Sequence, residues 1–110
     1  MNKKFEELEI NLNEYLKNNG VLEIPTDNKE KLKLLKRIYF NSKVEIDVND
    51  LKHSKDVKNG VNDPTYIDRI QNLEVNAYNS LYYISCVSGI VREEKRMKRI
   101  AKIKSFLKIK

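Results

Sequence analysis

The sequence predicts an all-α fold: a short helical bundle with one long central helix and a basic C-terminal helix. Three observations lead to this class. Helix-breaking residues are scarce, with three Gly and two Pro among 110 residues. Apolar residues recur at steps of three and four along most of the chain, which is the period of an amphipathic helix. Residues that favour helix starts and ends flank these periodic segments.

The first predicted helix covers residues 2–19. Its apolar stripe consists of Phe5, Leu8, Leu12, Tyr15 and Leu16. It ends at Asn18, Asn19 and Gly20, because glycine accepts the left-handed conformation that a helix C-terminus needs. Residues 21–25 are expected to form a short extended connector.

The second predicted helix covers residues 27–41. Thr26 and Asp27 set up its start, and Glu30 stands where a capping box places an acidic partner. Its apolar stripe consists of Leu32, Leu35, Ile38 and Tyr39. Its outer face is basic and is interpreted as solvated; it carries Lys29, Lys31, Lys33, Lys36 and Arg37.

Residues 44–51 alternate between apolar and polar side chains, which would suit a strand. A single strand has no visible partner in this sequence, so the stretch is interpreted as an extended or weakly helical connector. Residues 53–62 are polar and contain Asn59 and Gly60, which predicts an exposed loop.

The third predicted helix covers residues 64–88. Asp63 and Pro64 combine an N-cap aspartate with a proline at the first helical position, and Ser88 and Gly89 are expected to end it. A helix of this length, about 36 Å at 1.5 Å per residue, cannot be covered fully by the other two. Part of its stripe is therefore expected to contact another subunit. Tyr78, Tyr82 and Tyr83 on this helix are interpreted as core or subunit contacts.

Residues 92–110 carry the net positive charge of the chain. They contain nine Lys or Arg and two Glu, which gives +7, while the other ninety-one residues have thirteen basic and fourteen acidic side chains. We expect residues 1–91 to form the helical core and 92–110 a basic helix or tail, with Met97, Ile100, Ala101 and Ile103 facing inward. Such a local charge attracts a polyanion. Double-stranded DNA and an acidic protein surface both fit, and a solvated face is the alternative.

Enzymatic chemistry has no sequence support. His53 is the single histidine and Cys86 the single cysteine, too few for structural zinc. The sequence has no Gly-rich phosphate loop and no marked acid/base pair, so we expect neither cofactor nor metal. One cysteine cannot form an internal disulfide, which favours the cytoplasm. We expect no signal peptide and no membrane partner, because no long apolar run is present.

The order of these features resembles the small terminase subunit family of tailed bacteriophages over residues 5–100. An acidic helix start precedes a polar turn, a proline-started helix, a glycine followed by an aliphatic residue, and arginines. The residues that carry the resemblance are Thr26, Asp27, Asn28, Leu35, Tyr39, Lys58, Asn59, Gly60, Asp63, Pro64, Gly89, Ile90, Arg96 and Arg99.

The resemblance implies a non-enzymatic DNA-packaging adaptor in a bacterial host cytoplasm. Such a subunit forms a homo-oligomer, binds viral double-stranded DNA and delivers it to the large terminase subunit, which has the ATPase and nuclease activities. Its DNA-binding residues would be Arg92, Lys95, Arg96, Lys98, Arg99, Lys102 and Lys104, or these would dock on the large subunit. Its oligomer interface would be Leu73, Ala77, Leu81 and Ile84.

Two other functions remain open at this point. A phage transcription regulator would also carry long helices and a polar turn, although its usual C-terminal helix-turn-helix is missing from this sequence. A small helical interaction or inhibitor module would bind one protein and no nucleic acid.

Overall fold

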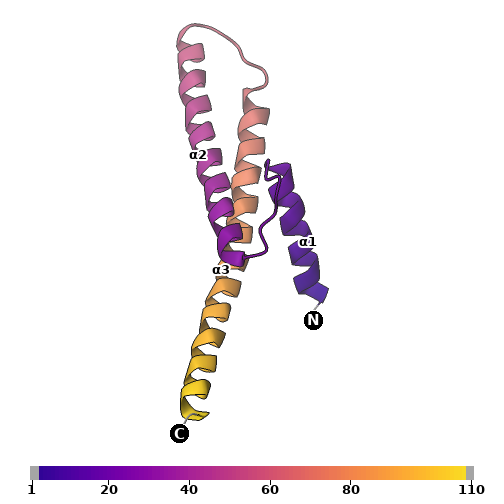
Figure 1. Cartoon of the computed structure of the whole chain (residues 1–110). Helices are drawn as coiled ribbons and strands as arrows, with labels where there is room; N and C mark the ends of the chain where they lie inside the picture. Colours follow the sequence, from indigo (N-terminus) through magenta and orange to yellow (C-terminus); the bar gives the residue numbers. More distant parts are fainter. Residues whose placement is uncertain (1–2, 109–110) are drawn as a thin grey trace.

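The computed structural model describes residues 3–108, and within them the chain forms three helices and no strand. They are α1 (Lys3–Asn18), α2 (Asn28–Lys58) and α3 (Tyr66–Lys108). The prediction of an all-α fold is confirmed. The helices α2 and α3 form a long antiparallel hairpin, and α1 lies beside its lower half (Figure 1). The described part measures 78 × 25 × 21 Å, because α3 continues well beyond the other two helices.

The end of α1 agrees with its prediction. Gly20 adopts a left-handed backbone with φ of 89°. The amide of Val21 donates to the carbonyl of Leu16 at 3.0 Å, and the amide of Gly20 donates to that of Lys17 at 3.0 Å. These two bonds form a Schellman motif, which satisfies the last carbonyl groups of the helix.

The start of α2 also agrees, since Asp27 is its N-cap and accepts a hydrogen bond from the amide of Lys29 at 3.3 Å. The predicted end at residue 41 is wrong, because α2 continues to Lys58. A second Schellman motif ends it at the Asn59 and Gly60 turn, where Gly60 has φ of 68°. Residues 42–58 are therefore neither a connector nor a loop.

The alternating pattern in residues 44–51 misled the prediction because the apolar side chains belong to different sides of α2. Val44 and Val48 are one helical turn apart and both exposed, whereas Ile46 is half-buried. The positions that face α3 in this part of the helix are largely polar, including Ser42 and Asn49. An inward face of polar residues gives no apolar helical period to detect.

The third helix begins slightly later than predicted and does not stop where predicted. The Asp63 carboxylate accepts from the amide of Thr65 at 3.0 Å, and α3 starts at Tyr66. The expected break at Gly89 is wrong, since α3 passes through it to Lys108. A glycine inside a helix costs only about 1 kcal/mol, and Val87 and Val91 on either side of Gly89 both pack in the core.

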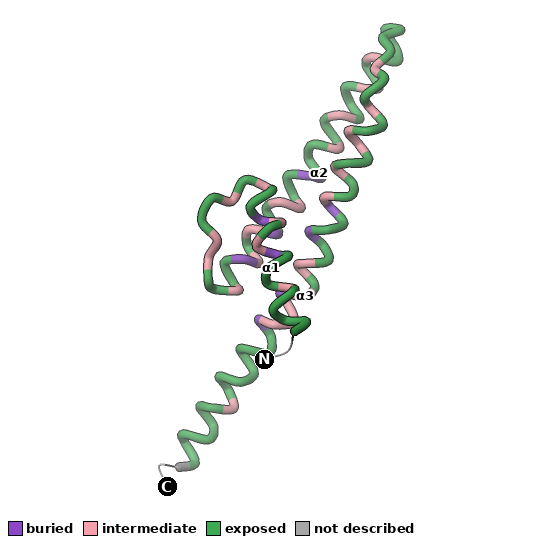
Figure 2. Tube along the Cα trace, turned by 90° about the vertical axis from the view of Figure 1, so that its right-hand side faces the viewer, coloured by how far each residue is buried: buried purple, intermediate pink, exposed green. Residues whose placement is uncertain are grey.

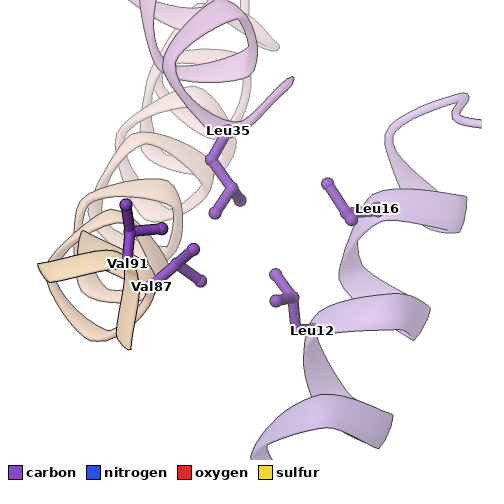
Figure 3. Close-up of a cluster of buried hydrophobic side chains, with 5 residues drawn as sticks. All are labelled: Leu12, Leu16, Leu35, Val87 and Val91. Carbon is purple, nitrogen blue, oxygen red and sulfur yellow. The ribbon is translucent and has the colours of Figure 1, made fainter. Parts of the chain in front are cut away.

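The core lies where all three helices meet, and Figure 3 shows its side chains converging. Two leucines come from α1, one from α2 and two valines from α3. The buried cluster consists of Leu12, Leu16, Leu35, Val87 and Val91. Complete burial of such a side chain contributes roughly 1.5–3 kcal/mol, and partly buried hydrophobic side chains packed around the cluster add to this stabilisation.

Beyond this core, the seam of the hairpin contains several polar contacts, and Figure 2 shows few buried positions along it. Asn76 of α3 is the central residue of this polar region. Its side-chain amide donates to the side-chain oxygen of Asn19 at 2.9 Å and to the hydroxyl of Ser42 at 3.2 Å. Its backbone carbonyl accepts a hydrogen bond from the hydroxyl of Tyr15 at 2.9 Å. Asn76 thus links α3 to the end of α1 and to α2.

The tip of the hairpin is also polar. Arg69 pairs with Asp63 at 2.7 Å and donates to Asn49 at 3.2 Å. The ring of His53 stacks on that of Tyr66, with centroids 3.8 Å apart. These contacts fix the register of α2 and α3 at the end farthest from the core.

Candidate nucleic-acid interface

The basic C-terminal segment is the second half of α3 rather than a separate helix. We call residues 92–108 the arm. Its described side chains are exposed, apart from the half-buried Ile100. Met97 and Ile103, which were expected to face inward, are 57% and 59% exposed. That expectation is wrong because α1 and α2 reach only the start of the arm, through Phe5 and Asn28, and α3 continues well beyond both helices (Figure 1).

The seven predicted DNA-binding residues do not share one face. At about 100° of rotation per residue, five fall within an arc of about 120°. We call these five the basic face: Arg92, Lys95, Lys98, Arg99 and Lys102. Arg96 lies outside this arc, and Lys104 lies on nearly the opposite side of the helix.

The basic face continues the side of α3 that enters the core. Val87 and Val91 are followed by Lys95, Lys98 and Lys102 at steps of three or four residues, so all five lie along one side of the helix. The change from valine to lysine explains why the bundle ends there. An ammonium group that lacks a partner is far too costly to bury.

The acidic residues of the arm leave most of the basic face uncompensated. Glu93 lies on another side of the helix, and Glu94 lies one turn before Lys98 and borders the same groove. Glu93 pairs with Arg96 at 3.6 Å, and Glu94 accepts a hydrogen bond from the side chain of Asn28 at 2.6 Å. The charges of the basic face therefore project into solvent, where they are available to an external anion.

The predicted oligomer interface is largely internal, which corrects that prediction. Ala77 is 6% exposed, Ile84 packs against the core cluster, and Leu73 is half-buried. Only Leu81, at 43%, is exposed. The stripe serves mainly to pack α3 within its own chain, because α2 extends far enough to cover it.

An outward apolar stripe lies on α2, in the part of the chain that was expected to be a connector. Phe40, Val44, Val48 and Leu51 are separated by three or four residues and are 42–66% exposed. The predicted tyrosine cluster also divides. Tyr83 packs against Tyr15 with ring centroids 5.1 Å apart, while Tyr78 and Tyr82 are exposed.

A second feature that the sequence did not reveal is the groove where α1 meets α3. Its inner part has a volume of about 270 Å³. Lys31, predicted on the solvated face of α2, is 4% exposed and lines this groove. Its ammonium pairs with Glu9 at 3.7 Å. The position of Lys31 depends on how α1 packs across the start of α2, which local sequence does not specify.

The described residues contain no group of three or more His, Cys, Asp or Glu side chains that could hold a metal ion. Over the same part of the chain, none of the helices has the length and apolar character required to cross a bilayer. In comparisons with known proteins, no family model, no curated protein and no solved structure matches this chain.

Proposed function

We propose that this chain is a non-enzymatic DNA-packaging adaptor similar to small terminase subunits. It binds viral double-stranded DNA through the basic face of its arm and hands the DNA to a large ATPase and nuclease subunit. It acts as a homo-oligomer. The observation that carries the proposal is a projecting helix with five basic residues on one uncovered side.

The dimensions of the arm support duplex DNA as the polyanion. An α-helix with its side chains is about 10–12 Å across, which matches the major groove of B-DNA at about 12 Å. The basic face extends over eleven residues, from Arg92 to Lys102, or about 15 Å of helix. Several phosphates on either side of a groove lie within reach of lysine and arginine side chains over that length.

Charge substitution on the basic face tests the proposal. We expect the triple variant Lys95→Gln, Lys98→Gln, Lys102→Gln to bind a generic duplex about 100-fold more weakly at low salt, because three phosphate contacts are lost. A matched control changes three exposed lysines of α2, Lys36, Lys52 and Lys55, to Gln and removes the same net charge. Its duplex affinity is expected to change several-fold less.

Two results would contradict the DNA proposal. In one, the parent protein fails to bind duplex DNA at 50 mM salt. In the other, the two triple variants lose affinity equally, which would show that net charge matters and the arm does not. Co-purification of a single protein partner without DNA binding would instead favour the interaction module.

A further inference from the structure

The groove between α1 and α3 continues directly onto the arm. Its inner part is floored by apolar side chains that include Phe5, Leu8 and Ile90. Its outer part is bounded by Phe5, Ile90 and Met97 and reaches Lys98. The two parts share Phe5 and Ile90, so a continuous apolar track leads out of the bundle along one side of α3.

The arm carries an apolar stripe on the side away from its basic face. Met97, Ile100, Ile103 and Leu107 fall within an arc of about 120°, centred roughly 140° from the centre of the basic face. Three of these four side chains are 57–63% exposed. A solvated lysine helix gains nothing from these bulky residues, whereas a helix that binds in a groove requires them.

Charge favours a basic occupant for the groove. Its rim carries four carboxylates, from Glu6, Glu9, Glu93 and Glu94, against the ammonium groups of Lys31 and Lys98. The arm carries Arg96 and Lys104 on its apolar side, within the same arc as the stripe, and these are the two predicted DNA-binding residues that fall outside the basic face. Glu93 shares this arc and pairs with Arg96 at 3.6 Å, so Lys104 is the cation that the arm offers to the carboxylates of the groove.

We propose that the groove binds the arm of a second copy of this chain. The apolar stripe of one arm covers the track from Phe5 to Met97 of the partner copy, and Lys104 faces its carboxylates. Met97 belongs both to the apolar stripe of the arm and to the outer part of the groove. When two chains lie antiparallel, each arm therefore covers the groove of the other chain, and the dimer is closed by symmetry. Four residues of the basic face remain outward and free for DNA in both arms, namely Arg92, Lys95, Arg99 and Lys102, while Lys98 borders the groove.

This inference rests on the homo-oligomer of the proposed function but not on DNA binding. Light scattering measures the mass of the full chain at a protein concentration of about 100 μM. We expect the parent protein to have the mass of two chains, and the double variant Ile100→Asp, Ile103→Asp to have the mass of one chain. Loss of two apolar contacts weakens association roughly 100-fold or more. A parent protein of one-chain mass, or a double variant that still pairs, would overturn the proposal.

A matched control introduces the same charges on the outward stripe of α2, as Val48→Asp, Leu51→Asp. Both positions are as exposed as Ile103, and this variant is expected to keep the two-chain mass. Dissociation of the control would place the contact on α2 and overturn the proposal. Circular dichroism checks that both variants remain helical.

Charge exchange provides a second test. Lys104→Glu in the arm is expected to weaken pairing about tenfold, and the added change Glu6→Lys in the groove is expected to restore it, because the rim and the arm attract each other electrostatically. Weakening without restoration would overturn the assigned pairing. The variant Lys95→Gln, Lys102→Gln keeps the groove residue Lys98, and it must still pair even where its duplex affinity falls.

Discussion

At the scale of single residues, stability is concentrated at a few buried positions. Leu16 is fully buried between all three helices, whereas Leu22 in the following connector is 95% exposed. We expect Leu16→Ala to lower the free energy of unfolding by about 2–5 kcal/mol, because it removes apolar contacts and leaves a cavity.

Chemical denaturation measures this change, with Leu22→Ala as the matched control. The control is expected to alter the free energy of unfolding by less than about 0.5 kcal/mol. Equal effects at the two positions would contradict the placement of α1 on the hairpin.

Asp63 makes the stability of the hairpin tip depend on pH. The Arg69 guanidinium at 2.7 Å, followed by hydrogen bonds from Thr65, holds the pKa of Asp63 well below its ordinary value of 3.8. A depressed folded-state pKa means that this stabilisation is complete above the unfolded pKa and is lost as pH falls below it. We expect Asp63→Asn to lower the thermal midpoint at pH 7.

The loss caused by Asp63→Asn is expected to shrink at pH 2.5, where the carboxylate of the unfolded parent protein is largely protonated. Thermal melts at the two pH values measure both effects. Asp47→Asn, on the exposed side of α2, serves as the control and is expected to change neither midpoint. A pH-independent loss for Asp63→Asn would contradict the role of this ion pair.

At the scale of helices, two glycines have opposite roles. Gly20 has a positive φ at the end of α1, while Gly89 is helical, with nothing within 4 Å of where a Cβ would stand. We expect Gly89→Ala to stabilise the protein by about 0.5–1 kcal/mol, since α3 is continuous and alanine favours helix. We expect Gly20→Ala to cost about 1 kcal/mol or more, because its backbone is left-handed.

Thermal or chemical unfolding of the two glycine variants measures these opposite signs. Destabilisation by Gly89→Ala would support a break in α3 at that position, as the sequence alone had suggested.

The hairpin is expected to open from its tip, because the buried apolar cluster lies in its lower half and the seam above it relies more on polar contacts. Hydrogen exchange measures this directly. Amides near Leu35 and Val87 should exchange most slowly, and those near Asn49 and Arg69 much faster. Uniform protection along α2 would contradict the idea of a stable base and a weaker tip.

The helix class and most helix ends could be predicted from the sequence, because their signals are local. Asp27 and Gly20 act through the backbone within a few residues, whereas the turn at Asn59 and Gly60 was assigned to a loop and ends α2 instead. The length of α2 could not be predicted, since its seam is polar and depends on partners such as Asn76 far along the chain. The burial of Lys31 likewise depends on α1 packing across it.

At the scale of the whole molecule, the chain separates its stable part from its charged part. The three-helix junction holds the apolar core, and α3 carries the arm away from it as one continuous helix (Figure 1). The sequence predicted the charge of this segment but not its two faces. Those faces could be assigned only when the helix proved continuous, because its phase is then set by Val87 and Val91.

The salt dependence of duplex binding tests the role of the basic face most directly. Five phosphate contacts predict a slope of about −4.5 for log affinity against log salt, so affinity should fall roughly 10²- to 10³-fold between 50 and 200 mM. In the triple variant Lys95→Gln, Lys98→Gln, Lys102→Gln, we expect the slope of log affinity against log salt to shrink to about −2. A duplex affinity that does not change over this range, or a variant with the parent slope, would contradict DNA binding by the arm.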